Sequence, residues 1–200
     1  MSLKSIEYIA SQFVIKFIQN NLPKWAVYHT LEHTIETVET SAEIGFYYNL
    51  PKEQMEILSI AGWFHDTGYV YGSENHEEKS VEIATDFLKR YYYPAKSISM
   101  VINCILATKI TSHPGNLLEC IIRDADLVSL GKSDYFKTNN LLKQEIEMRD
   151  NTTIKEIDWL IRSEKFLSSH SYFTDYAKLN FYPQLQLNLE KIQKRLNQDI

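Results

Sequence analysis

The sequence predicts an all-α protein, and three observations support this prediction. Glycine and proline are scarce, at 6 and 5 among 200 residues, so the chain has few of the tight turns that a β protein requires. Apolar residues recur every three or four positions along most of the chain, which is the period of an amphipathic helix. No segment of any length shows the polar–apolar alternation of a half-buried strand. Because no repeat or Ser/Gly-rich linker marks a boundary, residues 1–200 are predicted to form one helical domain.

The helices can be placed by their apolar stripes and by the residues that end them. The first stripe runs from Ile6 to Ile18 and stops at the Asn-Asn-Leu-Pro segment that ends in Pro23. The second helix starts after Tyr28 and runs out near residues 49–51, and the third begins at Pro51, a favoured first-turn residue. The remaining helices are expected from residue 76 to a break at 91–94, over 95–108, over 117–130, from about 134 to 148, over 153–168 and from 183 to the end.

Charge and composition exclude several classes of protein. The formal net charge is −5 and no long basic run occurs, whereas duplex nucleic acid is bound by clustered cations. No apolar run is long enough to cross a bilayer, and the first residues lack the apolar core of a signal peptide. Cys104 and Cys120 lie in apolar runs, which is typical of buried free thiols in a reducing compartment. We therefore expect a cytoplasmic protein with neither a membrane nor duplex nucleic acid as a partner, and the oligomeric state is left open.

The segment around His65 and Asp66 is the most informative part of the chain. These residues end the apolar run 57–64, and an imidazole nitrogen beside a carboxylate oxygen is a natural pair of ligands for a divalent metal. The alternative is a plain helix C-terminus, in which His65 favours the helix dipole and Asp66 opens a turn before Gly68. This segment alone leaves both interpretations open.

Two further segments carry residue types that bind metals. His29 and His33 are four residues apart and are expected on one face of the opening helix, although they can also simply cap and decorate it. Asp126 lies one turn after Ile122 on the apolar side of its helix, whereas Asp124 is expected to be rotated off that side. A buried carboxylate is costly unless it is paired or bound to a metal. Asp126 is therefore predicted to meet a metal or a basic side chain.

Together, His33, His65, Asp66 and Asp126 form a set of two nitrogen and two oxygen ligands from three helices. Such a set suits a borderline or hard divalent ion, namely Mn, Fe, Co, Ni, Zn or Mg, and not a thiophilic one. Four protein ligands leave positions open on an octahedral ion, where a water or a phosphate oxygen can bind. The sequence therefore predicts a divalent-metal site.

The order His … His-Asp … Asp on an all-helical chain resembles the HD-domain superfamily of metal-dependent phosphohydrolases, and in particular its small stand-alone members. The likeness extends over nearly the whole chain and is carried by Tyr28-His29-x-x-Glu32-His33, residues 61–69, Asn75-His76-Glu77-x-x-Ser80, residues 107–109, residues 124–131, and later positions at Trp159, His170 and Thr174. The resemblance implies a single-domain HD-type helical bundle with the metal site in a central cleft. It also implies a metal-site core at about residues 25–131, with C-terminal helices 132–200 packed on it.

The resemblance implies roles for individual residues as well. His33, His65, Asp66 and Asp126 match the metal ligands, and Asp66 is also expected to orient or deprotonate the bound water or to bridge to a second ion. His29 matches the position of a general-acid histidine in cyclic-nucleotide phosphodiesterases of the superfamily. Its alternative role is a helix-start histidine that hydrogen-bonds to the backbone.

His76 opens a helix after the loop and is expected to be a base in a water network, a ligand of a second metal or a cap. Glu77 and Glu78, in the first turn of that helix, are expected to be solvated partners of its dipole. Lys109 matches a cation that meets a substrate phosphate, or else it simply favours the end of its helix. Arg123 is an alternative for the same contact with substrate.

The loop over residues 67–75 is expected to form a lid. Its residues Tyr69 and Tyr71 could stack on a nucleobase, and Tyr69 is the candidate substrate contact. Tyr69 and Val70 stand where some HD hydrolases carry a Glu-Asp pair, so a mechanism in which that pair activates water is not expected.

These inferences predict an enzyme, namely a metal-dependent phosphohydrolase. Its substrate is expected to be a phosphoester or phosphoanhydride, as in a nucleotide or another small phosphorylated molecule. One alternative is a non-catalytic sensor that binds a nucleotide and a metal. Another is an iron-dependent HD oxygenase, which usually calls for a two-metal site with more His and Asp ligands.

Overall fold

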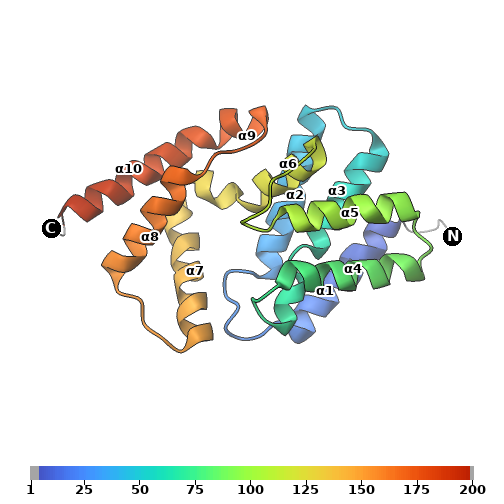
Figure 1. Ribbon diagram of the computed structural model, residues 1–200, viewed down its shortest axis with the longest axis horizontal. Helices are drawn as coiled ribbons and strands as arrows, with labels where there is room; N and C mark the ends of the chain where they lie inside the picture. Colours follow the sequence, from blue (N-terminus) through green and yellow to red (C-terminus); the bar gives the residue numbers. More distant parts are fainter. Residues whose placement is uncertain (1–4, 199–200) are drawn as a thin grey trace. The chain divides into compact units, whose positions relative to one another are not determined.

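The structure, a computed structural model, describes residues 5–198. Within that range it contains ten α-helices and two 3₁₀ helices and no strand (Figure 1), so the all-α prediction is confirmed. None of the described helices is both long and apolar enough to span a bilayer. The contacts between Cα atoms divide these residues into two compact units.

The first unit comprises residues 5–23 and His29–Asp126. Its elements are α1 (Ile6–Asn21), α2 (Leu31–Tyr47), α3 (Lys52–Phe64), η1 (Thr67–Tyr71), α4 (His76–Arg90), α5 (Ala95–Ala107) and α6 (Leu117–Asp126). The second unit comprises Lys24–Tyr28 and residues 127–198. Its elements are η2 (Val128–Gly131), α7 (Tyr135–Asp150), α8 (Glu156–Ser169), α9 (Asp175–Asn180) and α10 (Tyr182–Gln198).

Helix α3 is the central element of the first unit and contacts α1, α2, α4, α5 and α6. Ile60, Ala61 and Phe64 are fully buried, as expected for a helix that is apolar on all sides. Gly62 allows α2 to pack closely, because a Cβ there would lie 2.9 Å from Cγ2 of Val38. The loop between α2 and α3 is short, so the N-terminal turn of α2 lies beside the C-terminal end of α3.

An aromatic cluster fixes the helices around α3. The rings of Phe13, Phe64 and Phe87, from α1, α3 and α4, have centroids 5.0 to 5.9 Å apart. Figure 1 shows α4 and α5 side by side, and these helices are in contact. The beginning of α4 and the end of α5 are thereby held on the same body as the end of α3.

The second unit has its own apolar core, which includes Leu160, Leu167, Tyr172, Leu185 and Ile192. Asn188 on α10 is fully buried, and its Nδ2 donates to the carbonyl oxygens of Leu130 at 3.0 Å and Lys132 at 2.8 Å. The backbone N–H of Tyr28 donates to Oε2 of Glu145 at 2.9 Å, which ties the segment before His29 to this unit. The expected packing of residues 132–200 on the metal-site core, and the central cleft, stay predictions.

Three local expectations differ from the structure. The helix expected over 117–130 is divided, because Leu127 has φ −97° and ψ 17° between the end of α6 at Asp126 and the start of η2. The short α9 has six residues, too few to show a periodic stripe in the sequence. His29 precedes the extended N-cap residue Thr30, so the expectation that it shares a helix face with His33 is wrong.

Candidate metal centre

His65 is held by the backbone at the C-terminal end of α3. The residue is fully buried, and its N–H donates to the carbonyl oxygen of Ala61 at 2.9 Å. Its Nδ1 lies 2.8 Å from the carbonyl oxygen of Gly62, so Nδ1 carries the proton that this contact requires. Nε2 is then the ring nitrogen that faces His33 and Asp126 and that can exchange a proton for a metal.

Three other side chains meet His65 at this point. His33 lies in the first turn of α2, Asp66 is the N-cap of η1, and Asp126 is the last residue of α6. Nε2 of His65 is 3.1 Å from Oδ2 of Asp66 and 3.4 Å from Oδ1 of Asp126. The Nε2 atoms of the two histidines are 3.3 Å apart. Nε2 of His33 is 3.4 Å from Oδ2 of Asp66 and 3.1 Å from Oδ1 of Asp126. The four predicted ligand residues therefore converge.

The ligand atoms of His33, His65 and Asp66 have the mutual spacing expected around one divalent ion, whereas Asp126 contacts both histidines but lies outside that group. Bonds from zinc to imidazole nitrogen or carboxylate oxygen are about 2.0–2.2 Å long, which places neighbouring ligand atoms about 3.0 Å apart in an octahedron and about 3.4 Å apart in a tetrahedron. The five contacts of 3.1 to 3.4 Å agree with that range. His33, His65 and Asp66 can hold a metal through ligand atoms that all lie within 4.8 Å of one another. Oδ2 of Asp66 is buried and faces Nε2 of His65 at 3.1 Å and of His33 at 3.4 Å, and a buried carboxylate of this kind is stabilised by a positive partner such as a cation.

The charges of the site change the ionisation of its members. Burial lowers the pKa of His33, but hydrogen bonds to Asp126 and Asp66 and the charges of both carboxylates outweigh burial and raise this pKa to about 9. Against the effect of burial, the charge of Asp66 and contacts with both carboxylates raise the pKa of His65. Burial opposes ionisation of the two carboxyls, yet the histidines hold the pKa of both below the usual range. The imidazoles thus keep protons that a metal would displace, so metal binding is expected to weaken at low pH.

The four ligand residues fall inside a region that matches a known family. The model of the HD domain matches residues 30–131, just over half of the 200 residues. The chain belongs to the HD-domain family. The resemblance predicted from the His-Asp pair and its neighbours is therefore confirmed.

Two solved structures are similar to this HD protein. One is a predicted HD superfamily hydrolase from an uncultured Thermotogales bacterium, with 15% identity, a TM-score of 0.62, and coverage of 94% of this chain and 91% of that one. The other is a protein from Lactobacillus plantarum, with 12% identity, a TM-score of 0.68, and coverage of 99% and 96%. At these identities the likeness concerns the fold. No curated protein matches the chain at a significant level.

Three aromatic rings, those of His29, Tyr69 and His76, lie beside the four predicted ligand residues. The hydroxyl of Tyr69 is 3.2 Å from Nε2 of His29, and the two rings stack with centroids 4.0 Å apart and planes at 17°. His76 opens α4, as predicted, and its Nδ1 is 3.0 Å from the carbonyl oxygen of Ser73. Its Nε2 is 3.5 Å from Oδ1 of Asp66. The structure therefore brings all three rings next to the ligand set.

The first turn of α4 carries two acids with different surroundings. Glu78 lies 2.5 Å from Nζ of Lys109, and this hydrogen bond lowers the pKa of Glu78. Glu77 is only 8% exposed, with Oε2 3.5 Å from Nδ1 of His76. The expectation that both acids are solvated is therefore wrong for Glu77. The contact of Lys109 with a substrate phosphate stays a prediction.

Arg123 is buried and its guanidinium group covers the end of α5. Nη1 donates to the carbonyl oxygens of Thr108 and Ala107, and Nη2 donates to that of Ile110 at 3.1 Å. These carbonyls lie at or just beyond the C-terminus of the helix, where no intrahelical donor is left. Arg123 thus fixes the turn that carries Lys109, while its own contact with substrate stays a prediction.

Replacing Arg123 by methionine is expected to lower the free energy of unfolding by about 2–3 kcal/mol, because buried carbonyls lose their donors. Urea denaturation followed by circular dichroism measures this change. Arg162→Met is the matched control, since Arg162 is exposed and surface changes stay within about 0.5 kcal/mol. An Arg123 variant of unchanged stability but raised KM would instead show a contact with substrate.

The burial of Asp124 is the clearest difference between the prediction from the helical pattern and the structure. This residue is fully buried, although it was expected to be rotated off the core side of its helix. Residues 121–125 are all buried, so this stretch of α6 has no solvent face. Five consecutive buried residues have no helical period, and the sequence pattern therefore gives no signal for the burial of Asp124 or of Glu77.

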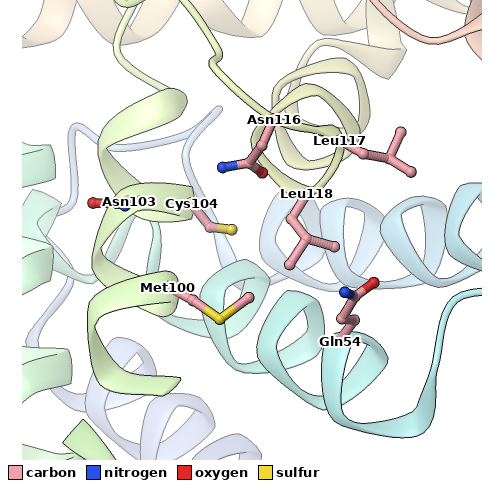
Figure 2. A pocket seen from close by; sticks show the side chains of 7 residues that line it. All are labelled: Gln54, Met100, Asn103, Cys104, Asn116, Leu117 and Leu118. Atoms are coloured by element: carbon pink, nitrogen blue, oxygen red, sulfur yellow. The ribbon is translucent and has the colours of Figure 1, made fainter. Parts of the chain in front are cut away.

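A pocket of about 320 Å³ lies between α3, α5 and the start of α6, apart from the HD ligands (Figure 2). Figure 2 shows Met100, Cys104 and Leu118 converging on it. Burial raises the pKa of the Cys104 thiol to about 12, so this group stays protonated at neutral pH. Cys120 is only half-buried, so the expectation of a buried thiol is confirmed for Cys104 alone. The pocket lacks a group suited to hydrolysis.

Proposed function

We propose that this HD protein is a metal-dependent phosphohydrolase that cleaves a phosphoester or phosphoanhydride bond in a small molecule. The observation that carries the proposal is the cluster of His33, His65 and Asp66 at ligand spacing, with Asp126 in contact with both imidazoles. The donor set suits Mn, Fe, Co, Ni, Zn or Mg. Rings able to donate or accept a proton lie beside it, as a hydrolase requires.

A divalent ion held by His33, His65, Asp66 and Asp126 would lower the pKa of a water and polarise a phosphoryl oxygen. In the proposed reaction the water oxygen forms a bond to phosphorus, and the proton it loses passes to Nε2 of His76 beside Asp66. The bond from phosphorus to the leaving oxygen breaks, and its electron pair stays on that oxygen.

Protonation of the leaving oxygen completes the proposed reaction. His29 gives its proton to that oxygen as a general acid. Lys109, held by Glu78 until substrate arrives, offsets the charge on the phosphoryl group. The protons on the two histidines then re-equilibrate through solvent, which restores the starting state.

A nucleotide is the substrate class that we favour. Tyr71 is 69% exposed at the end of η1 and is free to stack on a nucleobase, which is worth about 1–3 kcal/mol per base. Tyr69 is 5% exposed and its ring contacts two histidines, so Tyr71 suits this role better. We propose small phosphorylated molecules as partners in the cytoplasm, and neither duplex nucleic acid nor a membrane.

Phosphate release from purified protein tests the proposal. The metal-free protein is loaded with each of the six divalent ions and assayed with nucleotides and p-nitrophenyl esters, and its metal content is measured in parallel. Release that requires a metal and stops with chelator supports the proposal. Tight nucleotide binding without turnover in any metal would favour a sensor instead, and two equivalents of iron per chain would favour an oxygenase.

Lys109→Met is expected to raise KM about 10-fold, because a charge-assisted contact with the substrate phosphate is lost. Lys79→Met is the matched control, since Lys79 also pairs with a glutamate of α4, Glu82 at 3.0 Å. Steady-state kinetics of both variants measure the difference. Equal effects of the two substitutions would show that Lys109 only pairs with Glu78.

A further inference from the structure

Tyr69 joins the two histidines that the proposed reaction uses but that do not belong to the ligand set. Its ring stacks on His29 at 4.0 Å and contacts His76 at 4.3 Å, whereas the two imidazole centroids are 6.3 Å apart. Its hydroxyl also reaches Nε2 of His29 at 3.2 Å. A side chain only 5% exposed thus contacts His29 through both its ring and its hydroxyl.

The backbone around Tyr69 is itself fixed to the site. The N–H of Tyr69 donates to the carbonyl oxygen of Asp66 at 3.0 Å, and the N–H of Gly68 donates to Oγ of Ser80 at 2.8 Å. A Cβ at Gly68 would overlap the carbonyl oxygen of His76, so only glycine allows η1 to lie this close to α4. Tyr69 is therefore placed by the same residue, Asp66, that belongs to the ligand set.

His29, by contrast, lies outside regular structure. It precedes the N-cap of α2, so helical hydrogen bonds do not fix its backbone. A general acid must hold its proton within hydrogen-bonding reach of the leaving oxygen, and small displacements of a catalytic group are costly. The His29 imidazole stacks on the buried ring of Tyr69 at 4.0 Å, closer than its edge contact with His33 at 5.7 Å, so Tyr69 is the ring best placed to orient it.

We propose that Tyr69 is a positioning residue that holds His29 for protonation of the leaving oxygen. This inference rests on the proposed phosphohydrolase function. Tyr69, which the sequence suggested as a contact with substrate, is thereby assigned to the general acid His29 instead. The reaction is the one given above: the phosphorus–oxygen bond to the leaving group breaks, and the leaving oxygen takes the proton of His29.

The dependence on the leaving group provides the test. An alkyl phosphate needs a proton on its leaving oxygen, whereas p-nitrophenolate departs as an anion. His29→Ala is expected to lower kcat/KM for the alkyl ester by about 10²- to 10⁴-fold, the usual contribution of general acid catalysis, and for the p-nitrophenyl ester by less than about 10-fold. Tyr69→Leu is expected to show the same selective loss. Tyr69→Phe, which keeps the ring and loses the hydroxyl, is expected to show a smaller loss of the same kind.

A double variant separates positioning from a general effect on the fold. If Tyr69 acts through His29, then adding Tyr69→Leu to His29→Ala lowers the rate on the alkyl ester no further. Tyr8→Leu is the matched control, because Tyr8 is an exposed tyrosine on α1 of the same unit, and it is expected to leave the ratio of the two rates unchanged. Metal content and thermal unfolding are measured for every variant.

The outcomes distinguish the two proposals. If the unmodified protein, loaded with metal, hydrolyses neither ester, the phosphohydrolase function fails and the role of Tyr69 fails with it. If it hydrolyses both, but Tyr69→Leu and Tyr69→Phe slow both esters equally or add to His29→Ala, the function stands and the positioning role is overturned. If Tyr69→Leu lowers kcat/KM selectively for the alkyl ester and adds nothing to the effect of His29→Ala, both the phosphohydrolase function and the positioning role are supported.

Discussion

Replacing His65 by alanine is expected to abolish metal binding and phosphate release together. The ring is fully buried, and its Nε2 lies 3.1 to 3.4 Å from the nearest candidate ligand atoms of His33, Asp66 and Asp126. Loss of a residue that only hydrogen-bonds to a metal ligand already lowers metal affinity or activity by about 10- to 100-fold. Loss of a ligand in the centre of the set is expected to exceed that range. Metal content after dialysis and the initial rate of phosphate release measure the effect.

His113→Ala is the control for this substitution, since His113 is an exposed histidine in the turn before α6. It is expected to change neither metal content nor rate. Thermal unfolding of both variants in chelator, against the metal-free unmodified protein, separates loss of the ligand from loss of the fold. Undiminished phosphate release by a folded His65→Ala protein would place the chemistry elsewhere in the molecule.

Gly68→Ala is expected to destabilise the first unit by about 3 kcal/mol, the upper end of the usual cost of overpacking. An added Cβ would overlap the carbonyl oxygen of His76 and lie 2.9 Å from Cβ of Lys79. The first of these contacts is with backbone, so η1 or the start of α4 has to move. Because Tyr69 and His76 move with them, activity is expected to fall as well. Urea denaturation and the rate of phosphate release measure the two effects.

Gly115→Ala is the control for this change, because a Cβ there would meet only Oε2 of Glu119, at an ordinary 3.5 Å. Its stability is expected to stay within about 0.5 kcal/mol of the unmodified protein. If Gly68→Ala were as stable as this control, the close contact of η1 with α4 would not exist in solution. The positioning of Tyr69 would then lose its structural basis.

Helix positions could be predicted from the sequence wherever a stripe of apolar residues and a clear terminus coincide. The helix expected over 95–108 is α5, Ala95–Ala107, and the one expected to lead into His65 is α3, Lys52–Phe64. The prediction failed where a helix is very short, as in α9, or where the backbone changes from α to 3₁₀ geometry, as at Leu127. Such changes depend on the contacts of a few residues and leave no period in the sequence.

The convergence of the four ligand residues could be predicted from residue types, from the position of Asp126 on its helix and from the family resemblance. The sequence did not predict the surroundings of the residues next to the ligand set. Arg123 was a candidate for substrate, but its guanidinium donates to carbonyls beyond α5. Glu77 was expected in solvent and is buried. Both outcomes depend on which helix packs against these residues. The periodicity of one helix carries no information about its neighbours.

The sequence by itself determined the all-helical architecture and the kinds of ligand available, because helical periodicity and side-chain chemistry are local properties. Only the tertiary structure decided that Nε2 of His65 faces His33 and Asp126, and that Tyr69 lies against His29 and not in solvent. These features depend on close packing between distant segments, above all at Gly62 and Gly68. Contacts of this kind act over a few ångströms, so they appear only once the helices are in place.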